Sequence, residues 1–129
     1  MKLLLDTHTL MWWDSQFDRI PPKTQAILQN SDHEVWISVV SLWEMQIKSQ
    51  LGKLTLQVPL EELINYQQQV NGLKLLSVTV PHILELDKLP LHHRDPFDRL
   101  LIAQSRVETA ILVSQDTKMQ MYNCQILWQ

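Results

Sequence analysis

The chain has 129 residues, of which 45% are hydrophobic, and this size and composition are typical of one compact domain, so we expect a single domain over residues 1–129. Its only cysteine, Cys124, excludes an intrachain disulfide framework and a cysteine-rich zinc site. The formal net charge of −3 does not by itself suggest a nucleic-acid-binding protein, because contacts to phosphate need Lys and Arg.

The first apolar run begins at Lys2 and is interrupted by Asp6 and His8. It is too short and too polar for a signal peptide or a membrane span. We therefore expect a cytoplasmic protein without a membrane association.

Apolar runs and helix-capping signals predict strands that alternate with helices. The strands are expected near residues 2–6, 35–39, 75–80 and 110–114, with 125–128 as a candidate edge strand. The helices are expected from residue 7 to about 13, from 22 to about 29, from 41 to 51, from 60 to 70, from 81 to 86 and from 95 to 108. This alternation predicts an α/β fold, a three-layer sandwich around a mostly parallel central sheet of four to five strands.

Four acidic residues share one geometric property in this predicted fold, because each lies near the carboxyl end of a strand or near the start of a helix. Asp6 ends the first strand and Asp116 follows the fourth, whereas Glu44 and Asp98 fall in the first turns of two helices. Helices that follow parallel strands begin at the carboxyl edge of the sheet, where open α/β sheets bind ligands. We therefore expect the four carboxylates to meet at one edge of the molecule.

Four carboxylates in one cleft repel each other unless a positive charge compensates them. Mg²⁺ prefers oxygen ligands and keeps several waters, which can polarise a phosphodiester and supply a hydroxide nucleophile. Whether one or two metal ions bind stays open. The pattern favours phosphodiester hydrolysis, and the sequence contains no HExxH, P-loop, GxGxxG or GxSxG motif.

Each acid also has a purely structural interpretation. Ser41 and Glu44 fit a capping box, and Asp95 before a proline fits a helix N-cap. Asp6 fits a cap for the helix after the first strand, and Asp116 suits an ordinary turn. The functional interpretation therefore depends on the four acids together.

Four motifs in this order resemble the PIN-domain family and, within it, the VapC-like toxins of toxin–antitoxin pairs. They are LLLDTH at residues 3–8, SLWEMQIK at 41–48, HRDPFDRLLIAQ at 93–104 and LVSQD at 112–116. The third is the most specific, and the resemblance extends over nearly the whole chain.

The resemblance implies a metal-dependent endoribonuclease that acts on RNA, with Asp6, Glu44, Asp98 and Asp116 as catalytic and metal-binding residues and Mg²⁺ or Mn²⁺ as the cofactor. It also implies a homodimer and a cognate antitoxin that inserts a peptide segment near the acidic cleft. Asp95 lies one turn from Asp98 and either supports it or only caps the helix.

Further residues are weaker candidates. Thr7 and Ser114 are potential hydrogen-bond donors that orient carboxylates. Arg94 and Arg99 lie in or beside a loop, with two histidines, that is placed to contact the RNA backbone. An ion pair between Arg99 and a nearby acid is an equal alternative.

Tryptophans offer both stacking and packing roles. Trp36 and Trp43 lie in apolar patterns and are expected in the core, in preference to stacking on bases. Of Trp12 and Trp13, one is expected to face outward and to anchor an antitoxin or a dimer partner. His8 is expected to be structural, with orientation of a ligand as the alternative.

Two other functions compete with the nuclease. The first is a catalytically silent PIN-fold module that binds a protein partner and keeps the acids as caps. The second is an α/β phosphatase or phospho-receiver, which is disfavoured because His8 stands where a haloacid-type phosphatase needs Asp and no acidic pair of a receiver is present.

Overall fold

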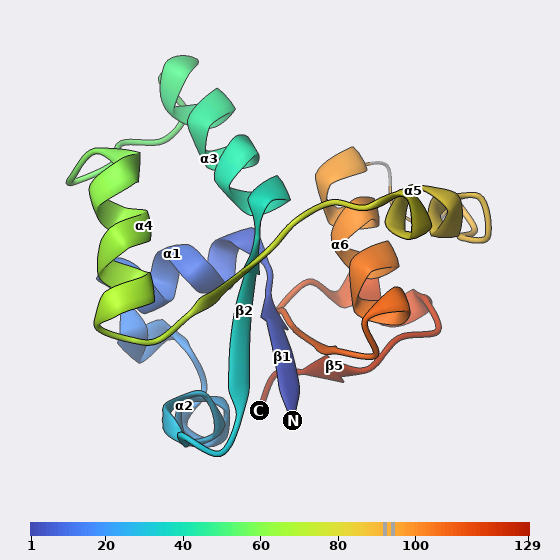
Figure 1. Cartoon of the computed structure of the whole chain (residues 1–129), viewed down its shortest axis with the longest axis horizontal. Coiled ribbons are helices and arrows are strands. Elements are labelled where there is room, and N and C mark those ends of the chain that lie inside the picture. Colours follow the sequence, from blue (N-terminus) through green and yellow to red (C-terminus); the bar gives the residue numbers. More distant parts are fainter. Residues whose placement is uncertain (92, 94) are drawn as a thin grey trace.

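The computed structural model describes residues 1–91, 93 and 95–129 (Figure 1). Five parallel strands form one sheet in the order β3-β2-β1-β4-β5, which confirms the predicted α/β fold with a parallel sheet. The strands are β1 (Lys2–Leu5), β2 (Glu34–Ser38), β3 (Lys74–Leu76), β4 (Ile111–Val113) and β5 (Ile126–Leu127). The α-helices are α1 (Thr7–Ser15), α2 (Pro22–Gln29), α3 (Val39–Gln50), α4 (Leu60–Gln69), α5 (Val80–Leu86) and α6 (Pro96–Val107), and two 3-10 helices are η1 (Phe17–Arg19) and η2 (Thr117–Met121).

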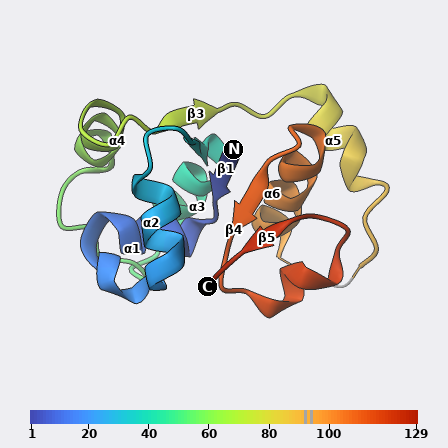
Figure 2. The same ribbon diagram turned by 90° about the horizontal axis from the view of Figure 1, so that it is seen from below.

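The central strand β1 is buried on both faces. Leu3 and Leu5 belong to one apolar cluster and Leu4 to the other, because successive side chains of a strand point to opposite faces. Helices α1, α2 and α4 lie on one side of the sheet and α5 and α6 on the other (Figure 2). Burial on both faces accounts for the unbroken apolar sequence of β1.

The chain changes from strand to helix earlier than predicted at the end of β2. The Ser38 hydroxyl accepts a hydrogen bond from the backbone N–H of Val40 at 3.1 Å, so Ser38 caps α3 and the helix begins at Val39. The prediction that Ser41 starts this helix is therefore wrong, because two β-branched valines in the first helical turn look like the end of a strand.

Three helices bring their N-terminal ends to the carboxyl edge of the sheet. Helix α1 follows β1 directly, and α3 continues from the end of β2 (Figure 1). Helix α6 packs against α3 and against β4, so its first turn reaches the same edge from the other side. In the part of the chain that the structure describes, no helix has the length and apolar character needed to cross a bilayer.

The tryptophans differ from the predictions. Trp43 is 57% exposed, with its ring centroid 5.3 Å from that of Phe97 in an edge-to-face arrangement, so it is not a core residue. Trp36 is only partly buried and lies below the ammonium of Lys2. Trp12 and Trp13 are both partly buried against the same cluster, so neither faces fully outward.

The packing of β1 generates a stability prediction. Leu4 is fully buried, so Leu4→Ala leaves a cavity and is expected to lower the free energy of unfolding by about 2–5 kcal/mol. Leu91 is 85% exposed, and Leu91→Ala is the matched control with a change within about 0.5 kcal/mol. Urea unfolding measures both values, and equal losses in the two variants would contradict this account of the core.

Candidate functional site

Asp6 directly follows β1 and is 4% exposed. Its Oδ1 accepts a hydrogen bond from the backbone N–H of Thr9 at 2.8 Å, so it caps α1 as the structural interpretation predicted. Its Oδ2 accepts a hydrogen bond from the Ser114 hydroxyl at 2.6 Å. Burial raises the pKa of Asp6 above its ordinary value even though these hydrogen bonds favour the ionised form.

Ser114 connects the acids at the ends of β1 and β4. Its hydroxyl donates to Asp6 and accepts a hydrogen bond from the backbone N–H of Asp116 at 3.0 Å. Asp116 in turn caps η2, because its Oδ1 accepts a hydrogen bond from the backbone N–H of Lys118 at 2.9 Å. Burial acts to raise the pKa of Asp116, but hydrogen bonds from His93 and Lys118 outweigh it and the pKa lies below the ordinary value.

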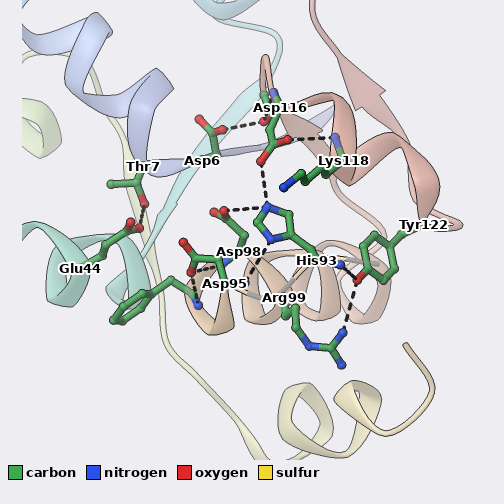
Figure 3. A network of polar contacts seen from close by, with 12 residues as sticks. Asp6, Thr7, Glu44, His93, Asp95, Asp98, Arg99, Asp116, Lys118 and Tyr122 are labelled. Carbon is green, nitrogen blue, oxygen red and sulfur yellow. Dashed lines mark hydrogen bonds and ion pairs between the residues drawn. The ribbon is translucent and has the colours of Figure 1, made fainter. Parts of the chain in front are cut away.

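Asp98 lies in the first turn of α6 and is the centre of the cluster (Figure 3). Burial, followed by the negative charges of Asp95 and Glu44, raises the pKa of Asp98 to about 7. The negative charge of Asp6 acts in the same direction. Asp98 therefore lies close enough to the other acids to share one electrostatic environment.

His93, which the sequence analysis places only in the loop expected to contact the RNA backbone, lies among the acids. Its Nε2 lies 3.1 Å from Oδ2 of Asp98 and 2.9 Å from Oδ2 of Asp116. Its Nδ1 accepts a hydrogen bond from the backbone N–H of Asp95, so in the neutral ring Nε2 carries the proton that faces the two carboxylates. Ligand atoms of these three side chains, His93, Asp98 and Asp116, lie within 4.8 Å of one another.

Glu44 is 3% exposed and lies in the second turn of α3, not in the first. Its Oε1 accepts a hydrogen bond from the Thr7 hydroxyl at 2.6 Å, and its Oε2 pairs with Nζ of Lys48 at 2.6 Å. This hydrogen bond to Glu44 raises the pKa of Lys48. The capping-box interpretation is wrong, because Ser41 lies inside the helix and its Oγ is 3.1 Å from Oγ1 of Thr7.

Two of the remaining candidates, Asp95 and Arg99, form hydrogen bonds with backbone groups near the site. Asp95 caps α6, since its Oδ1 accepts hydrogen bonds from the backbone N–H groups of Phe97 at 2.8 Å and Asp98 at 3.3 Å. Arg99 donates to the carbonyl of Pro90 at 2.9 Å and makes no ion pair among the described residues, so the predicted pairing with an acid is wrong. Arg94 lies outside the described residues.

A pocket of about 550 Å³ collects Asp6, Asp98 and Asp116 on its wall. Carboxylate oxygens suit a hard divalent cation such as Mg²⁺ or Mn²⁺. Burial raises the pKa of Asp6, and burial followed by the negative charges of neighbouring acids raises that of Asp98, so both positions disfavour an ionised carboxylate without a nearby cation. The donor set therefore fits a divalent metal ion.

Comparisons with known proteins identify the family of this chain and show similar folds. A model of the PIN domain matches residues 3–123. A chain in the DNA-bound VapBC2 structure from Rickettsia felis is similar with a TM-score of 0.76 at 15% identity, covering 100% of both chains. A chain of DNA-bound VapBC from Salmonella typhimurium gives a TM-score of 0.71 at 14% identity, covering 98% of this chain and 97% of that one. A chain of VapBC-1 from nontypeable Haemophilus influenzae gives 0.65 at 16% identity, covering 98% and 97%. No curated protein matches by sequence.

The raised pKa of Asp98 predicts a stability that depends on pH. Between about pH 4 and 7 the folded state keeps a proton that the unfolded chain releases, so stability falls as the pH rises through this window. In EDTA at pH 8 we expect Asp98→Asn to be more stable than the wild type by on the order of 1–3 kcal/mol and to show a smaller slope, which keeps only the part that the raised pKa of Asp6 contributes. Urea unfolding over pH 4–8 measures it, with the exposed-site variant Asp32→Asn as control. An unchanged slope in Asp98→Asn would contradict the prediction.

The cap made by Asp95 generates a separate prediction. Asp95→Ala is expected to lower the free energy of unfolding by about 1 kcal/mol, whereas Asp95→Ser keeps a capping oxygen and is expected to stay within about 0.5 kcal/mol of the wild type. Thermal unfolding with and without Mg²⁺ is the measurement. If Mg²⁺ stabilises the wild type but not Asp95→Ser, Asp95 is a ligand and not only a cap.

Proposed function

This chain belongs to the PIN domain family, and from that premise we propose that it is a metal-dependent endoribonuclease and the toxin of a toxin–antitoxin pair. Nuclease activity is typical of this family, so membership supports the assignment of this chain as a hydrolase at the coarse level. The observation that carries the finer proposal is the convergence of Asp6, Asp98 and Asp116 in one pocket, with His93 between two of them.

In this proposal Asp6, Asp98 and Asp116 hold Mg²⁺ or Mn²⁺. When bound, such an ion polarises a phosphodiester oxygen and lowers the pKa of a water nucleophile. The hydroxyl of Ser114 orients Asp6, and the backbone N–H of Lys118 orients Asp116. These fixed partners hold the carboxylates in place without a rearrangement of the backbone.

Glu44 belongs to the same acidic set in this proposal. Thr7 and Lys48 bind its two oxygens and fix their direction, and its charge already acts on Asp98. His93 holds a proton at Nε2 between Asp98 and Asp116, which reduces their repulsion until a metal ion takes over that role.

The proposed partners follow from the toxin assignment. The similar structures come from complexes named VapBC, which supports a cognate antitoxin protein as a partner of this chain. We also assign it RNA as the substrate, a homodimeric state and a place in the cytoplasm, in keeping with the resemblance of its four motifs to VapC-like toxins.

A silent protein-binding module is the second candidate, and one observation disfavours it. Asp6, Asp95 and Asp116 do cap helices, as that function requires. Asp98, however, accepts no capping hydrogen bond among the described contacts, and its raised pKa is a cost to stability at neutral pH. A destabilised acid in a pocket is typical of a functional site.

The proposal predicts cleavage of RNA by the purified protein in Mg²⁺ or Mn²⁺ and no cleavage in EDTA. Asp6→Asn keeps an oxygen for the cap at Thr9 but removes a ligand charge, so activity is expected to fall by more than the roughly 10–100-fold typical for groups behind the ligands. A gel assay on labelled RNA measures this, with Asp32→Asn as the matched control and circular dichroism to check folding. Full cleavage by Asp6→Asn, or cleavage that EDTA leaves unchanged, would contradict the nuclease.

A further inference from the structure

The pocket that contains the three acids has a second wall that the metal chemistry does not use. His8 and Trp12, one turn apart on α1, line the same pocket as Asp6 and Asp98. Residues four apart on a helix share one face, so the two rings lie side by side, with their centroids 5.9 Å apart and their planes inclined by 44°. His8 is close enough to Asp6 to act electrostatically on that carboxylate.

The ring of Trp12 is held in place by neighbouring side chains. The ring centroid lies 5.7 Å from that of Trp128, and the Arg19 guanidinium lies 5.9 Å from the Trp12 ring. Trp12 is only partly buried, and its neighbour His8 is exposed. Core packing accounts for the buried part of Trp12, but it does not explain an exposed imidazole beside it on the wall of the acidic pocket.

The charge of this pocket restricts how it can bind a nucleotide. Among the described residues, none of those that line it is Lys or Arg, although Lys118 is close enough for its charge to act on Asp116. These charges act on phosphate, whereas affinity for an uncharged base must come from uncharged contacts. Unpaired RNA bases stack on aromatic side chains, and this contact tolerates every base because each has a π-face.

We propose that Trp12 and His8 form a nucleobase-binding subsite, in which one unpaired base of the RNA stacks beside the nucleotide whose phosphate meets the acids. The subsite rests on the proposed nuclease function and adds its substrate-binding element. Gln115 and Thr117 are exposed on the same pocket wall and are placed to meet the polar edge of that base. The protein thus holds phosphate through a metal ion and base through α1.

The test compares adenosine 5′-monophosphate with ribose 5-phosphate in the presence of Mg²⁺, because the two ligands share phosphate and sugar and differ in the base. Binding to the full chain is followed by NMR titration. The wild type is expected to bind the nucleotide at least about fivefold more tightly than the sugar phosphate, the lower end for one stacked base.

Two tryptophans of α1 give a matched pair of variants. Trp12→Leu is expected to bring the affinity ratio of the two ligands close to one, whereas Trp13→Leu is expected to retain it. Trp13 is also partly buried, but its ring centroid lies 5.8 Å from that of Phe17 and it does not line this pocket. His8→Ala, at an exposed position, is expected to reduce the ratio in part and keeps the test valid if Trp12→Leu does not fold.

Equal affinities for the two ligands in the wild type would overturn the subsite, as would an equal loss of the ratio in Trp12→Leu and Trp13→Leu. A variant Trp12→Leu that loses a protein partner but keeps the ratio would also overturn it and make this wall a protein contact. The RNA cleavage assay is read separately. If the protein cleaves RNA but does not distinguish the two ligands, only the subsite proposal is rejected. If Trp12 provides base discrimination but RNA is not cleaved, only the nuclease proposal is rejected.

Discussion

Mutual repulsion of carboxylates around Asp98 is the constraint on which the site depends. The protein reduces this repulsion with its own cations and protons: Lys48 pairs with Glu44, and His93 lies between Asp98 and Asp116. These groups do not remove the repulsion completely, because burial and acidic neighbours still raise the pKa of Asp98 to about 7. Under the proposed function a divalent cation supplies the missing positive charge, and the fold must be stable enough to tolerate the repulsion without it.

Capping and function are not alternatives for two of these acids. Asp6 uses one oxygen to cap α1 and turns the other to Ser114, and Asp116 caps η2 while its second oxygen meets His93. A cap fixes the side chain at a helix N-terminus, so it also sets the direction of the second oxygen. The same hydrogen bonds that begin the helices therefore orient the acids toward the pocket.

The sequence predicts the sheet and the convergence of Asp6, Asp98 and Asp116, because both follow from strand–helix alternation and from the polarity of parallel strands, whereas Glu44 does not line their pocket. It fails where tertiary contacts decide. The cap at Ser38 is hidden by two following valines, so the start of α3 was placed too late. His93 lies in a loop without periodicity, and its role depends on a hydrogen bond from the backbone of Asp95. Arg99 donates a hydrogen bond to the backbone carbonyl of Pro90, and the pattern of charges in the sequence does not predict a contact with a backbone group.

The net charge of −3 also has a physical interpretation under the proposed function. A protein that binds RNA through surface cations carries an excess of Lys and Arg, whereas this pocket is lined by acids and aromatic rings. Its attraction for phosphate then comes from an ion that the sequence does not count, and its attraction for bases from π-faces that carry no net charge. The affinity for RNA is therefore coupled to the affinity for metal, so an overall acidic chain and a nuclease are compatible.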